Sequence, residues 1–341
     1  MFPFHVISGA AARRIVSASR ADIIEQVRRT YLRHHDGETI NPNSYFLRFP
    51  QRPNARIIAL PAYLGGEQEV AGIKWISSFP DNVARNVPRA SAALLLNDMA
   101  TGYPFACLEA SQISAARTAA SAAVAATALQ GGASAGRVAV IGAGVISRNI
   151  VDFLFAAGWE VGEYRVFDRI AEYGERLTGY IGTLGAEATL APSLEACVEG
   201  AELVVFATTA AEPYVTAPDA FAAGQNVLNI SLRDLGPELV AESHNLVDDI
   251  DHCLTANTSP HLAEQKYGHR DFIDGTLAEL LRGDVTLTAD KPRIFSPFGL
   301  GVLDLAVGMH VYQEALRSEE AVEIPGFFGE TERWEQENQK I

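Results

Sequence analysis

Lysine, cysteine and basic charge are all scarce in this sequence. Four lysines stand against 23 arginines, and the formal net charge is −15, which argues against a nucleic-acid or anionic-membrane partner. Cys107, Cys197 and Cys253 are widely spaced and form neither a disulfide framework nor a Cys-x-x-Cys metal motif. This cysteine usage is typical of a reducing cytoplasm.

Long uncharged hydrophobic runs are also missing, so no membrane-spanning helix is predicted. The nearest is the Ala-rich segment 115–129, but Arg117 and several hydroxyls within it indicate a tightly packed soluble helix. The first residues lack a charged segment followed by a long apolar one, so we expect no signal peptide. We expect a soluble, cytoplasmic protein.

Two domains are expected, because 341 residues exceed the size at which single cores stop growing. Up to about residue 112, a helical segment within 19–37, stopped by Gly37, precedes apolar segments with a period of two. Pro, Gly and Asn separate these segments, and the pattern predicts an α+β domain. From residue 137, short apolar strands alternate with helices, which predicts a parallel, doubly wound sheet. The polar segment 329–341 is expected to be mobile.

The segment VAVIGAGVISRNI carries a dinucleotide-binding pattern between a predicted strand and a predicted helix. Gly142 permits a tight turn, and Gly144 lets the backbone approach a pyrophosphate held by the N–H groups of the helix N-terminus. Ser147 replaces the third glycine of the motif, which we expect only to loosen the packing of helix on strand. Asp168 ends the next strand, where an acid accepts ribose hydroxyls and favours NAD over NADP. Arg165 and Arg169 nearby keep NADP open.

Lys74 lies in the apolar segment EVAGIKWISSF, on the same predicted strand face as Val70, Gly72 and Ile76. One interpretation is a lysine that grips a substrate carboxylate or moves a proton. The other is an edge-strand lysine that reaches solvent. Because lysine is so scarce in this chain, we favour the functional interpretation.

Other charged residues are candidates for substrate binding and proton transfer. Arg48 and Arg117 could each bind a carboxylate in bidentate fashion, as could Arg89. Asp234 follows an apolar strand of the doubly wound domain, where ligands bind such sheets. It is either a general base acting on water or the N-cap of the following helix. The histidines show no metal-ligand spacing, so no metal site is expected.

Five segments together resemble the ornithine cyclodeaminase/μ-crystallin family: LPAYLGG…GIKW, ATGYPFACLEASQISAARTAA, VAVIGAGVISRN, VVFATT and FSPFGLGVLDLAVG. They occur in family order over nearly the whole chain. The resemblance implies a substrate-binding and dimerisation domain at 1–112 with 303–341, a Rossmann NAD-binding domain at 113–302, and a homodimer. It implies catalytic roles for Lys74 and Asp234 and carboxylate binding by Arg48, Lys74 and Arg117, to which we add Arg89. The expected cofactor contacts are Ser91, Gly142, Ala143, Gly144, Val145, Ile146, Asp168, Arg169, Thr208, Thr209 and Ser231.

Departures from the cyclodeaminase pattern indicate a different branch of the family. SLRDLGPE lacks the lysine of the family's Gly-Gly-Asp…Pro-Gly-Lys loop, and Pro297 replaces a serine. NPNSYFLRFP, NISLRDL and ANTSPHLAEQ instead resemble dehydrogenases that oxidise N-(1-amino-1-carboxy-2-ethyl)-glutamate with NAD to 2,3-diaminopropionate and 2-oxoglutarate, for siderophores or peptide antibiotics. The alternatives are an ornithine or lysine cyclodeaminase, an imine reductase or alanine dehydrogenase, and a non-catalytic ligand-binding protein of the μ-crystallin type.

Overall fold

The computed structural model describes residues 2–66 and 69–332, which form two compact units. The first unit comprises Met1–Ala18, Glu38–Ser114 and Asp304–Ile341, and the second comprises Ser19–Gly37 and Ala115–Leu303. Residues 19–37, which the sequence assigns to the first domain, thus belong to the second unit. Residues 333–341, most of the segment for which we expect mobility, lie outside the described residues.

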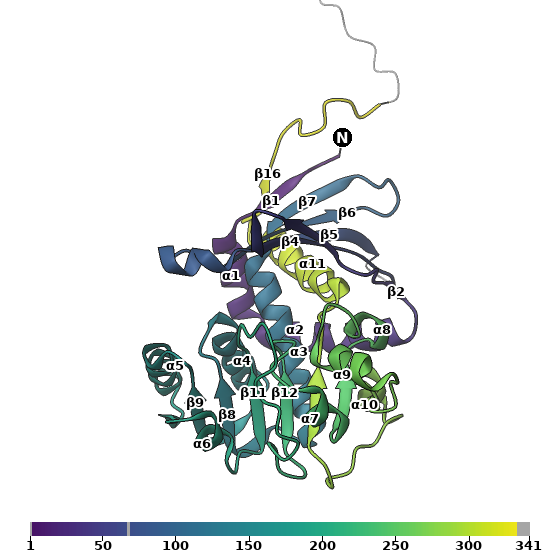
Figure 1. Cartoon of the computed structure of the whole chain (residues 1–341). Helices are drawn as coiled ribbons and strands as arrows, with labels where there is room; N and C mark the ends of the chain where they lie inside the picture. The colour runs from purple at the N-terminus through teal and green to yellow at the C-terminus, as the bar shows by residue number, and fades with distance from the viewer. Residues whose placement is uncertain (1, 67–68, 333–341) are drawn as a thin grey trace, which may run out of the picture. The chain divides into compact units, whose positions relative to one another are not determined.

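The first unit is built on one eight-stranded sheet (Figure 1). Its main path runs β16-β1-β7-β6-β5-β4-β2, and β3 also pairs with β4. The strands are β1 (His5–Ile7), β2 (Thr39–Ile40), β3 (Tyr45–Phe49), β4 (Arg52–Leu64), β5 (Val70–Ser78), β6 (Ala90–Asn97), β7 (Pro104–Glu109) and β16 (Val322–Glu323). Helix α1 (Gly9–Ala18) and the short 3₁₀ helix η1 (Pro80–Arg85) also belong to this unit.

The central strands of this sheet alternate as their sequence predicts, because side chains of a strand point to opposite faces in turn. Helix α11 (Gly301–Arg317) covers one face: Leu305 lies against Gly72 of β5, and Gly308 lies against Leu94 of β6. Lys74 points to this covered face. Since β5 lies between β4 and β6, the edge-strand interpretation of Lys74 is wrong.

The second unit contains a parallel sheet in the order β10-β9-β8-β11-β12-β15-β13-β14. The chain order reverses between β8 and β11, which is where doubly wound folds bind ligands. The strands are β8 (Ser134–Ile141), β9 (Glu160–Phe167), β10 (Ala188–Leu190), β11 (Leu203–Phe206), β12 (Asn226–Asn229), β13 (His244–Val247), β14 (Gly275–Thr276) and β15 (Arg293–Ser296). The predicted fold class, a Rossmann unit beside a second α/β sheet, is confirmed.

Helices accompany this parallel sheet. They are α2 (Arg20–His35), α3 (Ser111–Gln130), α4 (Val145–Ala156), α5 (Ala171–Thr183), α6 (Leu194–Val198), α7 (Pro237–Ala241), α8 (Ile250–Cys253), α9 (Ser259–Tyr267) and α10 (Leu277–Arg282). Helix α3 starts in the first unit and continues into the second. Its alanines let it pack closely along most of its length, as the composition of this segment predicts.

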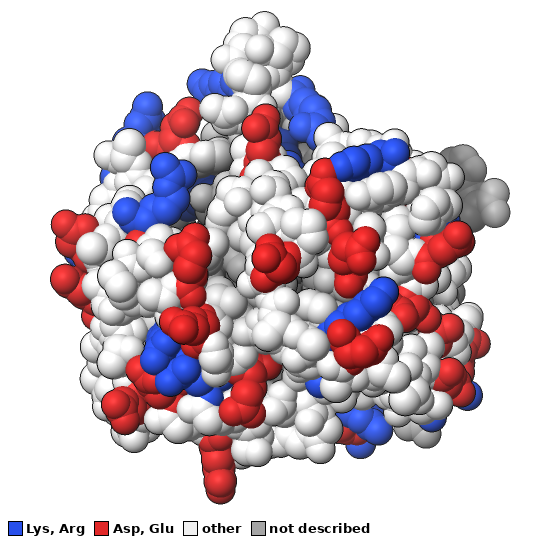
Figure 2. Space-filling model, turned by 60° about the horizontal axis from the view of Figure 1, so that its bottom comes forward, with Lys and Arg blue, Asp and Glu red and all other residues white. Residues whose placement is uncertain are grey.

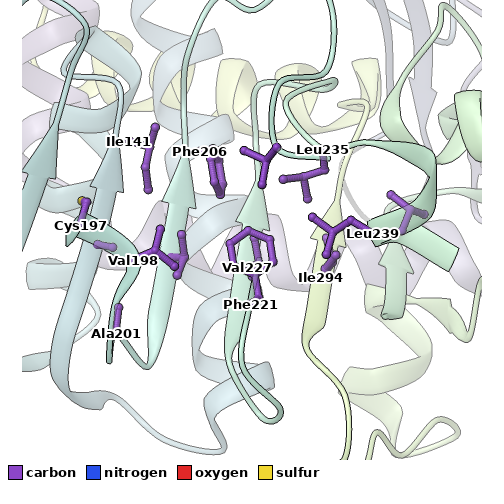
Figure 3. Packing of buried hydrophobic residues seen from close by; sticks show 14 of the residues in the cluster. Ile141, Cys197, Val198, Ala201, Phe206, Phe221, Val227, Leu235, Leu239 and Ile294 are labelled. Atoms are coloured by element: carbon purple, nitrogen blue, oxygen red, sulfur yellow. The ribbon is translucent and has the colours of Figure 1, made fainter. Parts of the chain in front are cut away.

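The core of the second unit is formed by apolar side chains of neighbouring parallel strands (Figure 3). Ile141, Phe206, Val227 and Ile294 come from β8, β11, β12 and β15 in turn. Cys197 of α6 completes one side of this cluster, and burial raises the pKa of its thiol to about 12, so the thiol stays protonated. All three cysteines are free.

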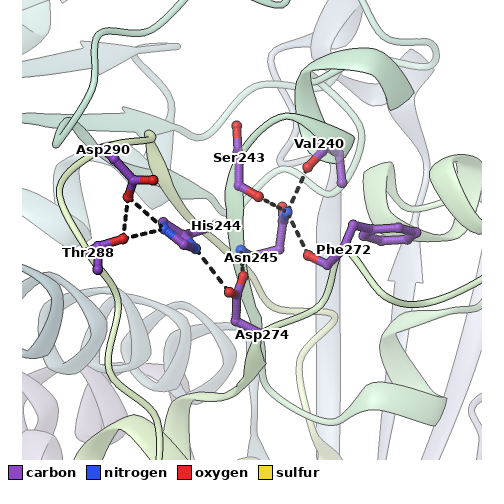
Figure 4. Close-up of polar contacts among 8 residues, drawn as sticks. All are labelled: Val240, Ser243, His244, Asn245, Phe272, Asp274, Thr288 and Asp290. Carbon is purple, nitrogen blue, oxygen red and sulfur yellow. Dashed lines mark hydrogen bonds and ion pairs between the residues drawn. The ribbon is translucent and has the colours of Figure 1, made fainter.

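A cluster of polar contacts surrounds His244 and Asn245 at the amino end of β13 (Figure 4). The His244 ring contacts Asp274 over 2.9 Å on one side and Thr288 over 3.0 Å on the other. The Asn245 side-chain amide donates to three backbone carbonyls, those of Val240, Ser243 and Phe272. Because this cluster lies at the edge opposite the carboxyl ends of the strands, we interpret it as structural.

The surface shows acidic and basic side chains interspersed (Figure 2). On the face drawn there, Lys and Arg side chains alternate with Asp and Glu side chains instead of gathering into a basic patch. Among the described residues, no helix is both long and apolar enough to cross a bilayer.

Candidate active site

The predicted dinucleotide loop lies between β8 and α4. Gly142 has a φ of +88°, in the left-handed region that glycine adopts readily, and a Cβ there would lie 2.6 Å from the Ala207 carbonyl oxygen. Ser147, which is fully buried, donates its hydroxyl hydrogen bond to the Gly142 carbonyl. The serine in place of the third glycine therefore anchors the loop, a role that the sequence interpretation missed.

Asp168 lies directly beside this loop, just after β9. One carboxylate oxygen accepts the Ala143 N–H over 2.7 Å, and the other accepts the Ile170 N–H over 2.9 Å. Arg169, the next residue, is exposed. The acid is thus placed where ribose hydroxyls are bound in folds of this type.

The residues around the loop fit a dinucleotide. A Cβ at Gly144 would meet no atom within 4 Å, which leaves space for a pyrophosphate above the loop. Helix α4 begins at Val145 without a side-chain cap, so its first N–H groups can bind a phosphate. Val145 is exposed and Ile146 is half-buried at this end of α4.

Asp234 follows β12 and is fully buried among hydroxyl groups. Its Oδ1 accepts hydrogen bonds from Thr208 and, over 2.9 Å, from Tyr214, and its Oδ2 accepts one from Ser231. Burial, and then the charge of Asp234, raise the pKa of the Tyr214 phenol, so Tyr214 stays a donor. The N-cap of α7 is Gly236, so the interpretation of Asp234 as its capping residue is wrong.

The predicted residues of the second unit therefore gather at one edge of its sheet. The glycine loop, Asp168, Thr208 and Asp234 follow β8, β9, β11 and β12, which are neighbours in the sheet and parallel. Thr208 and Ser231, expected to contact the cofactor, donate to Asp234, while Thr209 is exposed at the same edge. This concentration of polar groups at carboxyl ends is where such sheets bind ligands.

Arg117, in the second-unit part of α3, lies near the same edge. A Cβ at Gly299, which follows β15, would be 2.4 Å from the Arg117 Nη1 atom. The N–H groups of Phe298 and Gly299 donate to the Asp248 carboxylate over 3.0 and 2.6 Å. Burial raises the pKa of Asp248, and these two N–H groups act in the opposite direction. Asp248 thus fixes the loop against which Arg117 packs.

In the first unit, Lys74 forms a buried ion pair. Its Nζ lies 2.5 Å from Asp304 Oδ2 of α11 and donates to Ser114 Oγ over 3.2 Å. The side chains of Lys74 and Asp304 are 1% and 0% exposed. Asp304 went unnoticed in the sequence, although it is the one charged residue in the apolar segment GLGVLDLAVG.

The other first-unit candidates are divided between the two faces of the sheet. Arg48 is on the same face as Lys74, because Arg48 pairs with Arg56 and Arg56 with Ser78, four residues from Lys74 on β5. Ser91 pairs with Ser77 and is therefore on the opposite face, where the two hydroxyls lie 2.8 Å apart. Arg89 is exposed just before β6.

Sequence reasoning missed three residues of these sites. Asp304, Tyr214 and Asp248 all make contacts with predicted site residues or the loops that hold them. Only Asp304 left a signal, a lone acid in an apolar helix. Among the described residues, no cluster of His, Cys, Asp and Glu could hold a metal ion.

Known proteins resemble the chain in sequence and in structure. The model of the ornithine cyclodeaminase/mu-crystallin family matches residues 10–319. The N-((2S)-2-amino-2-carboxyethyl)-L-glutamate dehydrogenase of Staphylococcus aureus is 31% identical over 269 residues, which cover 76% of this chain and 79% of that protein. The structure of Thermococcus litoralis Δ(1)-pyrroline-2-carboxylate reductase, in complex with NADH and L-proline, matches with a TM-score of 0.85 at 24% identity, covering 94% of this chain and 100% of that one.

An archaeal alanine dehydrogenase, solved as a dimer with bound NAD, has the same fold, with a TM-score of 0.84 at 23% identity over 96% of this chain and 100% of that one. The glycine loop and Asp168 form a dinucleotide site, and the 31%-identical relative is a dehydrogenase, so the chain is a dinucleotide-dependent oxidoreductase. The chain belongs to the ornithine cyclodeaminase/mu-crystallin family. It is an NAD-dependent member, as the placement of Asp168 indicates.

Proposed function

We propose that the chain oxidises N-((2S)-2-amino-2-carboxyethyl)-L-glutamate, also written N-(1-amino-1-carboxy-2-ethyl)-glutamate, to 2,3-diaminopropionate and 2-oxoglutarate. The reaction breaks the C–H bond at the glutamyl Cα and then the C–N bond with water. It consumes NAD and releases NADH and a proton. A relative that is 31% identical over three quarters of the chain supports this substrate.

The observation that carries the proposal is the cationic face of the first-unit sheet. The substrate has three carboxylates, and an acidic protein must hold them with local positive charge. Lys74 and Arg48 lie on one face, and the buried contact with Asp304 fixes the Lys74 ammonium. Arginine forks bind carboxylates in bidentate geometry, so Arg48 and Arg117 suit the remaining acids.

In the second unit, bound NAD would supply the hydride acceptor, held by the glycine loop and Asp168. Holding the substrate by its carboxylates orients its Cα, and such orientation can be worth roughly 7–11 kcal/mol of the barrier. Asp234 takes the proton from the water that attacks the imine carbon, a role worth on the order of 10² to 10⁴ in rate. Thr208, Tyr214 and Ser231 hold its carboxylate in one orientation. Collapse of the carbinolamine then frees the two products.

The uncovered face of the first-unit sheet supports a homodimer. Tyr45 is 71% exposed and Trp75 is 45% exposed. Both residues pair with Ala59, so they lie on the face opposite Lys74. Leu47 is also exposed on that face. Exposed apolar patches of this kind are typical of protein–protein interfaces. Light scattering after gel filtration tests this: the wild type elutes as a dimer and Trp75→Glu as a monomer, whereas a monomeric wild type would refute it.

The reaction is tested by following NADH absorbance with a panel of substrates. The glutamate derivative should give NADH, while ornithine and alanine at the same concentration should give less than a tenth of that rate. Ammonia and proline formed from ornithine without net NADH would instead establish a cyclodeaminase. NADH from alanine alone would establish an alanine dehydrogenase.

A further inference from the structure

Arg48 and Arg56 face each other directly across β3 and β4. Arg56 in turn faces Ser78 across β4 and β5. Directly opposed side chains of antiparallel strands share a face, with Cβ atoms about 4.5–5.5 Å apart. Three polar side chains from three strands therefore form one row on the face that also carries Lys74.

Like charges directly across strands repel each other, and a ligand anion bound between the two arginines would reduce that repulsion. Arg48 is exposed, and its guanidinium stands 5.1 Å from the centre of the Phe46 ring on the same face. That stacking keeps the guanidinium above the sheet, where its N–H groups can meet a ligand. A carboxylate between the two forks would be bound by charge and by paired hydrogen bonds.

Ser78 gives independent evidence for a ligand in this row. Its side chain is 7% exposed, and within the described residues its Oγ has no hydrogen-bond partner. Buried hydroxyls nearly always have a hydrogen-bond partner. The unpaired Ser78 hydroxyl next to Arg56 therefore indicates that a bound ligand supplies this partner. A carboxylate oxygen is the acceptor that a serine hydroxyl and two guanidinium groups would share.

The row is separated from Lys74 along the sheet. Ser78 and Lys74 are four residues apart on β5, about 13 Å at roughly 3.3 Å per residue. Helix α11 contacts β5 at Gly72, through Leu305, and at Lys74, through Asp304. One carboxylate therefore cannot occupy both positions. Because long side chains lean along the strands, the Lys74 position and the row of Arg48, Arg56 and Ser78 can each bind a different carboxylate of one substrate.

We propose that Arg48, Arg56 and Ser78 form a second carboxylate subsite, which selects amino acids with a carboxylate remote from the reacting carbon. The inference rests on the proposed function and deepens it, since it explains how the chain would distinguish a glutamate derivative from alanine or ornithine. Arg56 and Ser78 are the specificity-determining residues of this subsite. Neither is among the residues that the sequence predicts for the site.

The test measures binding without turnover, so that it does not depend on the reaction. Calorimetric titration of the protein saturated with NADH, first with glutarate and then with butyrate, compares a dicarboxylate with a monocarboxylate of similar length. The wild type should bind glutarate at least tenfold more tightly. Arg56→Gln should abolish this preference and Ser78→Ala should reduce it severalfold, while both leave butyrate binding within twofold.

Arg29→Gln, which removes an exposed arginine of α2, is the matched control and should keep the wild-type ratio. If Arg56→Gln does not fold, Arg56→Lys keeps the charge, loses the fork and should give an intermediate ratio. An Arg56 variant with the wild-type ratio, or a wild type that does not prefer glutarate, overturns the subsite. Failure of the wild type to oxidise the glutamate derivative would refute the proposed function alone, because the glutarate ratio is measured without substrate.

Discussion

Lys74 Nζ lies 2.5 Å from Asp304 Oδ2, and both side chains are closed off from solvent. Removing one member of a buried ion pair leaves an uncompensated charge, which typically costs about 3–5 kcal/mol. Asp304→Asn should therefore lower the free energy of unfolding by that amount in urea titrations. Glu25→Gln, which breaks an exposed pair with Arg29, should cost less than about 1 kcal/mol. Equal losses in the two variants would show that the buried pair is not a structural element.

The two loop glycines should respond differently to the same substitution. Gly142→Ala would put an alanine at a left-handed φ, with its Cβ 2.6 Å from the Ala207 carbonyl oxygen. It should therefore lower both the melting temperature and the NADH affinity. Gly144→Ala meets no protein atom and should leave the melting temperature unchanged. It should nevertheless weaken NADH binding at least tenfold, measured by fluorescence titration, because the methyl group occupies the space of the pyrophosphate. Unchanged NADH affinity in Gly144→Ala would place the cofactor elsewhere.

Asp234→Asn preserves the shape of the side chain and removes its capacity to take a proton. Turnover should fall by about 10² to 10⁴, while NADH affinity stays within a few-fold of the wild type. Tyr214→Phe is the matched comparison, because it removes one of three hydroxyl donors to the same carboxylate and leaves Thr208 and Ser231. Its turnover should fall less than tenfold. Full activity in Asp234→Asn would show that another group takes the proton from the attacking water.

His252 should make the protein less stable in mild acid. Burial is the main cause that lowers the pKa of its ring; Asp248 and Asp249 oppose this shift, and His34 adds to it. An unfolded histidine has a pKa of about 6.5, so the unfolded state takes up the proton first as the pH falls. The contribution of neutral His252 to the free energy of unfolding is then fully present above about pH 6.5 and decreases below it.

Urea unfolding at pH 7.5 and pH 5.5 measures this linkage. In His252→Gln the loss of stability between the two pH values should be smaller than in the wild type. His269→Gln, at an exposed position, should keep the wild-type loss. A His252→Gln protein with an unchanged pH dependence would contradict the assignment.

Much of the fold could be predicted because local pattern and burial agree. The period-two alternation around Lys74, the Ala-rich helix from Ser111 and the strand before Gly142 all occur within a few residues of their expected bounds. The helix over Gly9–Ala18 was not predicted, because its two arginines and its small residues weaken the apolar signal. Such elements form through tertiary packing rather than through local propensity.

The candidate site was predictable where chemistry follows a strand end and unpredictable where it depends on register. Asp168 and Asp234 could be placed from the sequence because each follows an apolar strand of a doubly wound sheet. The row of Arg48, Arg56 and Ser78 depends on which residues face each other across three strands, and a shift by one residue would move each side chain to the other face. The hydroxyl of Tyr214 reaches Asp234 through the path of a loop, which no periodic pattern describes.

The stoichiometry of a complete reaction tests the central claim most directly. Limiting N-((2S)-2-amino-2-carboxyethyl)-L-glutamate is incubated with excess NAD, and NADH, 2-oxoglutarate and 2,3-diaminopropionate are each quantified at the end point. The account predicts equal amounts of all three products, each equal to the substrate consumed. Consumption of substrate without net NADH, or NADH without release of 2-oxoglutarate, would contradict it.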